Sequence, residues 1–160
     1  MEIEKKYSVK NLPSDYKTWN KKEIEQGYLC ADPVVRIRKS NEEYYLTYKS
    51  PTNLSEDTIV SHEVEVPLTK ESYYHLSKKI DDHVITKTRY LKELEDGHIA
   101  ELDHFHGILE GLIFVEVEFE SLEAVETFKK PDWFYEDISS DHRFKNNKLI
   151  KINNLSELNL

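Results

Sequence analysis

The chain begins with alternating charged residues that suit metal binding. Glu2, Glu4 and Lys6 are spaced two apart, so in an extended strand their side chains share one face, opposite Ile3 and Lys5. Carboxylate oxygens are the ligands that Mg²⁺ and Mn²⁺ prefer, and an ammonium group beside them can hold an anion. Because a solvated edge strand would show the same alternation, the interpretation depends on whether other strands repeat it.

The spacing does recur, and the charges are sorted by sign within each predicted strand. The acidic pairs are Glu2/Glu4, Glu63/Glu65, Glu101/Asp103 and Glu116/Glu118, and the basic pairs are Arg36/Arg38 and Lys87/Arg89. Like charges on one face of a strand repel each other, and a solvated surface of mixed polar residues avoids this. The sorting favours an enclosed polar interior in which acids bind metal and bases bind an anion.

Eight strands with antiparallel connections are predicted to position these side chains. They cover residues 2–10, 26–29, 34–38, 43–49, 59–67, 84–91, 98–105 and 113–120. Helices are predicted near residues 14–20, 70–80, 121–128 and 142–152, and three of them follow the N-cap candidates Ser14, Thr69 and Ser121.

Two arrangements of these strands are consistent with the pattern. Eight strands can close into a barrel whose interior holds side chains or one small ligand. If the charged faces point inward, the apolar faces point outward, and the helices near 14–20, 70–80 and 121–128 must cover them. In the alternative arrangement, the apolar faces form the core of a sheet sandwich and the charges face solvent. The alternation by itself leaves both open.

Composition limits the classes of function. A chain of 160 residues suits one domain, predicted over residues 1–153 with a tail at 154–160. The net charge of −9 argues against binding a nucleic-acid duplex through a general basic surface. The single cysteine, Cys30, allows no intrachain disulfide, and no apolar run approaches membrane-spanning length. We therefore expect a cytoplasmic protein with no membrane partner.

Two further kinds of site are not expected. The chain has no Gly-rich phosphate loop, which excludes a P-loop enzyme. His98, His104 and His106 raise the question of a zinc site. No cysteine or helical HxxxH partner accompanies them, so zinc is not expected there.

A series of short motifs resembles the CYTH domain family, also called triphosphate tunnel metalloenzymes. The opening Glu2-x-Glu4-x-Lys6 is similar to the family's ExExK motif, and the similarity extends over nearly the whole chain. The other matching segments are residues 26–29, 36–38, 46–50, 63–65, 86–90, 101–103, 115–119 and 141–146. The chain is most similar to the short bacterial single-domain members. Tyr7-Ser8 and Phe144 depart from the common pattern and bear on substrate preference more than on fold.

The resemblance implies an α+β fold built on an eight-stranded antiparallel β-barrel, a tunnel with a charged interior, flanked by helices. A C-terminal helix is expected to close one mouth. The implied function is hydrolysis of the terminal phosphoanhydride of inorganic triphosphate by a metal-dependent triphosphatase that uses Mg²⁺ or Mn²⁺. The alternatives are a thiamine triphosphatase, a nucleoside triphosphatase, an adenylate cyclase or a non-catalytic polyphosphate-binding protein. The expected partners are a triphosphate-containing small molecule and a second copy of the chain in a homodimer.

The resemblance, together with the shared faces, also implies roles for individual residues. The implied metal ligands are Glu2, Glu4, Glu116, Glu118 and, more weakly, Asp103. The implied catalytic residues are Glu2, Glu4, Lys6, Lys87, Glu63 and Glu65, the last two completing the metal shell or orienting the attacking water. The implied phosphate-binding residues are Lys6, Arg36, Arg38, Lys49, Lys87, Arg89 and Lys145, which offer forked or point-charge donors. For Tyr28, a place in the tunnel beside Lys6 and a packing role are both open. For Arg143, a role in the lid and a surface role are both open.

Overall fold

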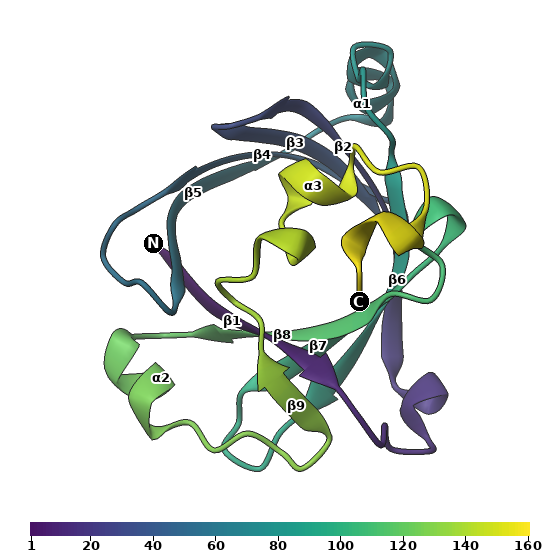
Figure 1. Cartoon of the computed structure of the whole chain (residues 1–160). Coiled ribbons are helices and arrows are strands. Elements are labelled where there is room, and N and C mark those ends of the chain that lie inside the picture. The colour runs from purple at the N-terminus through teal and green to yellow at the C-terminus, as the bar shows by residue number, and fades with distance from the viewer.

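The strands form a closed barrel. The computed structural model describes residues 1–160 and contains one antiparallel sheet in the order β5-β4-β3-β2-β6-β7-β8-β1-β9, which closes because β5 also pairs with β1 (Figure 1). The strands are β1 (Glu2–Val9), β2 (Asn20–Ala31), β3 (Val34–Ser40), β4 (Glu43–Pro51), β5 (Ile59–Pro67), β6 (Ile85–Glu93), β7 (Ile99–Phe105), β8 (Ile113–Phe119) and β9 (Phe134–Asp137). The predicted eight-stranded antiparallel barrel is confirmed, and the sandwich is excluded.

Two strands differ from the prediction. The strand expected at 26–29 is much longer, because residues from Asn20 onward pair with β6 and the ladder overrides their weak strand propensity. Strand β9 was missed. It pairs with the end of β1, where Tyr7 lies opposite Asp137, and so lies outside the ring of eight. A strand of only four residues carries too little alternation to be recognised from sequence.

The helices are short. They are α1 (Lys70–Ser77), α2 (Leu122–Thr127) and α3 (Asn146–Leu149), with 3₁₀ turns η1 (Tyr16–Thr18), η2 (Gly107–Leu109), η3 (His142–Phe144) and η4 (Leu155–Leu158). Thr69 and Ser121 cap α1 and α2 as predicted, since each side-chain oxygen accepts a backbone N–H at 3.1 Å. The helix expected at 14–20 is only the turn η1. None of the helices has the length and apolar character needed to cross a lipid bilayer.

The apolar strand faces point outward and are covered, as predicted for a charged interior. Under α1, Ile37, Tyr44 and Tyr73 form one buried cluster. A second cluster on the outer faces of β1, β7 and β8 packs against residues of η1, α2 and the segment before β9. One strip stays uncovered: Val64 on the outer face of β5 is 61% exposed, beside Tyr48 and Val66.

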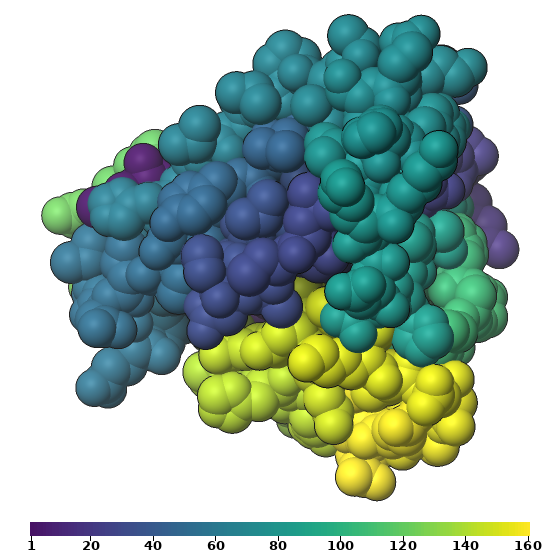
Figure 2. Space-filling model, turned by 90° about the horizontal axis from the view of Figure 1, so that it is seen from above, coloured from purple at the N-terminus to yellow at the C-terminus, as the bar shows by residue number.

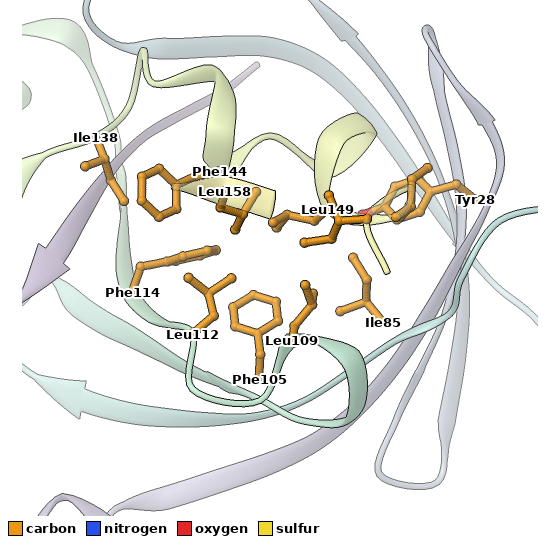
Figure 3. Close-up of a cluster of buried hydrophobic side chains, with 12 residues drawn as sticks. Tyr28, Ile85, Phe105, Leu109, Leu112, Phe114, Ile138, Phe144, Leu149 and Leu158 are labelled. Carbon is orange, nitrogen blue, oxygen red and sulfur yellow. The ribbon is translucent and has the colours of Figure 1, made fainter. Parts of the chain in front are cut away.

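Residues 138–158, which we call the C-terminal cap, lie across one end of the barrel (Figures 1 and 2). The single helix expected at 142–152 is broken into η3 and α3 because Lys145 has an extended backbone, with φ −76° and ψ 144°. The break lets Phe144 and Leu149 both point into the core (Figure 3). Leu158, from the segment predicted as a tail, is buried in the same core. The domain boundary after residue 153 stays a prediction.

Candidate active site

The strand register turns the predicted charged side chains into the barrel interior. Residues directly opposite each other on neighbouring strands share a face, and such pairs run around the ring. They are Glu4/Glu118, Lys6/Glu116, Glu101/Glu116, Arg89/Asp103, Gln26/Arg38, Arg36/Thr47, Lys49/Glu63, Thr47/Glu65 and Glu2/Ser61. The interior is enclosed, since Glu4, Arg36 and Lys87 are each less than a tenth exposed.

The two signs of charge occupy opposite halves of the ring. Four neighbouring strands, β5, β1, β8 and β7, form what we call the acid half, with inward Glu63, Glu65, Glu2, Glu4, Glu118, Glu116, Glu101 and Asp103. The other four, β6, β2, β3 and β4, form the basic half, with inward Lys87, Arg89, Arg36, Arg38 and Lys49. Lys6 on β1 is the basic side chain in the acid half. The lumen therefore has an anionic wall and a cationic wall.

The acid half contains a cluster that fits a divalent metal ion. One carboxylate oxygen from each of Glu2, Glu4 and Glu118 lies within 4.8 Å of the others. Burial, and then the charge of Glu116, raise the pKa of Glu4 to about 8. Burial, and then Glu101 and Glu2, raise the pKa of Glu118 to about 7. Raised pKa values mean that these carboxylates have too little neighbouring positive charge to stay ionised at neutral pH. A metal ion would supply that charge, and a donor set made only of oxygens suits hard cations.

Lys49 neutralises this cluster only in part. Its Nζ forms an ion pair with Glu2 and lies 3.8 Å from oxygens of both Glu4 and Glu63. Burial lowers the pKa of Lys49, but the nearby carboxylates, Glu4 first, outweigh it and raise the pKa overall. Burial and Glu2 raise the pKa of Glu63 to about 7, and its buried Oε2 accepts no hydrogen bond. Glu63 is therefore a carboxyl group able to take up a proton near neutral pH.

Lys6 points toward the C-terminal cap. Its Nζ donates to the carbonyl of Phe144 at 3.2 Å and lies 4.6 Å from the centroid of the Phe114 ring. Burial would raise the pKa of the neighbouring Glu116, but Lys6 and Arg89 outweigh burial and hold that pKa below its ordinary value. The cap thus orients a cation at the mouth of the lumen.

Asp103 serves as the buried counter-ion of two bases. It is fully buried and accepts from Lys87 Nζ at 2.7 Å and from Arg89 Nε and Nη2 at 2.7 and 2.9 Å. Burial would raise the pKa of Asp103, but Arg89 and Lys87 hold it well below its ordinary value. Burial lowers the pKa of Lys87 to about 8, despite Asp103. Both carboxylate oxygens of Asp103 therefore already accept hydrogen bonds from bases. Its role as a metal ligand stays a prediction.

Arg36 and Arg38 have no anionic partner. Arg38 donates from Nε and Nη2 to the amide oxygen of Gln26 at 2.9 and 2.7 Å, and burial, then Arg36, lower the pKa of Arg38 to about 10. Arg36 donates to Thr47 Oγ1 at 3.3 Å, while its buried Nε has no acceptor. Guanidinium groups that are buried or half-buried and have unused donors fit a bound anion, which would satisfy those donors.

Two neutral residues of the lumen were missed in the sequence. Gln26 joins Arg38 to Tyr28, and Thr47 joins Arg36 to Glu65, to which its hydroxyl donates at 2.9 Å. The site residues were predicted from charged side chains, and neutral residues such as these are not found in that way. The available signal was alternation, because Gln26 is two residues from Tyr28, and Thr47 is two residues from Lys49.

Glycine at position 27 lets the side chain of Ile80 approach the backbone of β2 closely. A Cβ on Gly27 would overlap the side chain of Ile80, which packs on the outer face of the strand. Because Gly27 has no side chain, Ile80 can pack directly against the outer face of β2. Gln26 and Tyr28, on either side of Gly27 in the sequence, point inward.

Tyr28 lies in an apolar cluster and Arg143 lies on the surface, and both placements are among the roles left open for these residues. The Tyr28 hydroxyl accepts from Gln26 Nε2 at 2.8 Å, at the edge of the apolar core in Figure 3, whereas Lys6 donates to Phe144. Arg143 pairs with Asp141 at 2.7 Å and donates to the carbonyl of Asn159 at 3.0 Å, on the outside of the cap. Substrate binding by Tyr28 stays a prediction.

The lumen opens to solvent beside the cap. A cavity of about 540 Å³ lies between the loop 52–58 and the cap, and Glu4, Lys6 and Lys49 line it together with the exposed Lys145 at its rim. A smaller cavity of about 140 Å³ is lined by Arg38, Arg89 and Glu65. A small polyanion entering beside the cap would meet Glu4, Lys6 and Lys49 together.

Comparisons with known proteins agree with this geometry. The CYTH domain family model matches residues 1–149. A protein of Nitrosomonas europaea named inorganic triphosphatase is 36% identical over 151 residues, covering 92% of this chain and 95% of the relative. One of the same name from Acetivibrio thermocellus is 37% identical over 154 residues, covering 94% and 93%. A crystal structure of an inorganic triphosphatase, 33% identical, superposes with a TM-score of 0.68 and covers 96% of this chain and 97% of its own.

Proposed function

This chain belongs to the CYTH domain family, and from that premise we propose that it hydrolyses the terminal phosphoanhydride of inorganic triphosphate inside the tunnel. The observation that carries the proposal is the division of the lumen into an acid half and a basic half. Relatives at 36% and 37% identity that are named inorganic triphosphatases support the choice of substrate. The reaction depends on a divalent metal, for which we propose Mg²⁺ or Mn²⁺ because the donors are all carboxylate oxygens.

The basic half would bind the substrate. Arg36 and Arg38 have free or neutral-paired donors, and Lys87 reaches the same wall beside Asp103. Together with Lys6 and Lys49 they would hold the phosphate oxygens and stabilise the charge that develops during phosphoryl transfer, a reaction that depends on positioning and electrostatics. Arg89 and Lys145 complete this set, the first inside the wall and the second at the rim.

The acid half would hold the metal and manage the proton. Glu2, Glu4 and Glu118 would be the main ligands, which their clustered oxygens support, and Glu116 on the same strand as Glu118 would assist them. The metal ion, when bound, supplies positive charge that neutralises phosphate oxygens and favours ionisation of the attacking water. Glu63 would accept the proton of that water at Oε2, since its pKa of about 7 matches the working pH of a general base. Glu65, tied to Thr47, would orient the water.

A phosphate-release screen tests the proposal. The chain is assayed with tripolyphosphate, thiamine triphosphate and ATP, each with Mg²⁺, Mn²⁺ or a chelator, and the products of ATP are checked for cyclic nucleotide. Fastest turnover on tripolyphosphate, lost with the chelator, is expected. Preference for another substrate would replace the proposed one, and tight triphosphate binding without turnover in any metal would favour a non-catalytic binding protein.

We keep a homodimer as a prediction, to be checked by light scattering on the purified chain. A cytoplasmic location also stays a prediction, to be checked by fractionation of the source cells.

A further inference from the structure

Outside the barrel, three metal-ligating side chains converge where β7 leads into η2. His104 lies on the outer face of β7, because its neighbours Asp103 and Phe105 point inward. The turn η2 then brings His106 and Glu110 beside it. One ligand atom from each of His104, His106 and Glu110 lies within 4.8 Å of the others. The sequence contains no cysteine or helical histidine pair at this point, so the turn creates a grouping that linear spacing did not predict.

The atoms that face one another are specific. Glu110 Oε2 lies 3.4 Å from His106 Nδ1, and Glu110 Oε1 lies 3.8 Å from His104 Nε2. The two imidazole rings are stacked, with centroids 5.3 Å apart. The Glu110 side chain is 63% exposed and free to turn. Ligand atoms at metal–ligand distances near 2.1 Å in a tetrahedral site are about 3.4 Å apart, so a small rotation of Glu110 would bring its carboxylate to about that spacing from both histidines.

A hydrogen-bonded chain through the buried Thr88 orients one of the histidines. Thr88 Oγ1 lies 2.7 Å from His106 Nε2 and donates its proton to Glu23 Oε2 at 2.9 Å. Since that proton is used, the Thr88 oxygen must accept from the Nε2–H of His106. In the neutral imidazole, the Nδ1 lone pair of His106 therefore faces Glu110. A second ring nitrogen that donates to a fixed acceptor is the usual support of a metal-binding histidine.

We propose that His104, His106 and Glu110 form a second metal site, for a divalent transition ion of the zinc class. Two imidazole nitrogens and one carboxylate oxygen suit such an ion and do not suit Mg²⁺, which takes oxygen ligands. A fourth position is left for water, because His106 and Glu110 face solvent. The site shares no residue with the lumen, so it stands independently of the proposed triphosphatase activity.

Binding at this site would stabilise the capped end of the barrel. The turn between His106 and Glu110 contributes Leu109 to the apolar core of the cap, where Leu149 also lies (Figure 3). A metal ion that joins His104 on β7 to both ends of the turn would fix the turn, and Leu109 with it. The melting temperature of the chain should therefore rise when the ion binds.

The test uses the full chain without a polyhistidine tag, with Mg²⁺ in excess so that the lumen is supplied with its own ion. Zn²⁺ is titrated in competition with a chromophoric chelator. One tight Zn²⁺ per chain is expected, with at least tenfold weaker binding in His104→Ala and in His106→Ala. His75→Ala, which alters an exposed histidine on α1, is the matched control and should bind as the wild type does.

Two further readouts separate this site from the lumen. Cu²⁺ bound at the site should show coupling to nitrogen in its electron paramagnetic resonance spectrum, lost in the double variant His104→Ala/His106→Ala. Thr88→Val keeps all three ligands but removes the acceptor of His106, and should weaken Zn²⁺ binding by about tenfold or more. Zn²⁺ affinity unchanged in the folded His106→Ala and Thr88→Val variants would overturn the proposal, as would wild-type binding no tighter than that of the double variant.

Discussion

The acid half and the basic half of the lumen are opposite in sign but alike in being poorly neutralised. In the acid half, Glu4 on β1 lies directly opposite Glu118 on the neighbouring β8, and the pKa of Glu4 rises to about 8 because of burial and Glu116. In the basic half, burial and Arg36 lower the pKa of Arg38 to about 10. Lys49, Lys87 and Arg89 do pair with acids of the facing half, but these pairs leave Glu4 and Arg38 without a full counter-charge. A metal ion with a polyphosphate would supply both missing charges.

Asp103 and Glu4 show how position decides the use of a carboxylate. Both are buried inside neighbouring parts of the ring. Asp103, at the border with the basic half, is paired with Lys87 and Arg89, whereas Glu4 shares a single lysine, Lys49, with other acids. Pairing stabilises the native state around Asp103. Repulsion among the clustered carboxylates destabilises the metal-free protein around Glu4. This is consistent with a role of Glu4 in binding rather than in stability.

The largest expected effect comes from Glu4→Gln. Loss of a ligand carboxylate should lower tripolyphosphate hydrolysis on the order of 1,000-fold, measured as phosphate release. The same change should raise the melting temperature of the metal-free protein above pH 8. The folded-state pKa of Glu4 is about 8, above its ordinary value of 4.5, so the stability from its protonated form is lost as pH rises toward 8, and glutamine retains it.

Glu95→Gln, in an exposed turn, is the control for this change and should leave both activity and stability near wild type. Full activity in Glu4→Gln would remove Glu4 from the metal site. A lower melting temperature at pH 9 in the chelator would contradict the view that the acid half is short of positive charge.

The next largest effect should be on stability, from Asp103→Asn. The change leaves Lys87 and Arg89 buried without their counter-ion, which should lower the free energy of unfolding by about 3 kcal/mol, measured by denaturant unfolding. Glu101 cannot replace the lost carboxylate for Lys87, since it already pairs with Arg89 at 2.9 Å. An unchanged unfolding midpoint would mean that Asp103 and Glu4 do not differ in pairing as described.

A smaller effect is expected from Arg36→Gln in the basic half. Arg36 has a buried Nε without an acceptor, so its donors are free for phosphate. Its loss should lower kcat/KM for tripolyphosphate by about 30-fold, about 2 kcal/mol, with little loss of stability. Arg36→Lys retains the charge but not the forked pair of donors, so its kcat/KM should lie between those of the wild type and Arg36→Gln. Wild-type kinetics in Arg36→Gln would exclude this arginine from substrate binding.

The smallest effect is expected outside the acid half, where Lys5 donates to Asp137 on β9 at 2.6 Å. Burial would raise the pKa of Asp137, but hydrogen bonds from Lys5 and Ser139 hold it below its ordinary value of 3.8. The stability it contributes is therefore present above pH 3.8 and is lost as pH falls through the lower folded-state pKa.

Asp137→Asn should lower the free energy of unfolding by about 1 kcal/mol at pH 7, because the carboxylate is partly open to solvent. The difference from wild type should shrink in strong acid, as followed by thermal melts over a pH series. Activity should be unchanged. A loss comparable to that of Asp103→Asn would erase the distinction between pairs inside and outside the ring.

Local features of the chain were predictable because they depend on residues near in sequence. Alternation placed Glu2, Glu4 and Lys6 on one face, and side-chain caps placed the starts of α1 and α2 at Thr69 and Ser121. The motif series then identified the barrel. The broken cap helix was not predictable, because its apolar spacing suits a continuous helix and only the packing of Phe144 and Leu149 requires the break.

The amino-acid sequence by itself determined the sign of charge on each strand and which residues share its face, since both follow from the two-residue repeat of an extended backbone. Only the tertiary structure decided that the acidic strands are neighbours, that Asp103 pairs with bases, and that His104, His106 and Glu110 meet outside the barrel. These depend on closure of the ring between β1 and β5 and on the course of one turn, which bring together side chains that no local pattern relates.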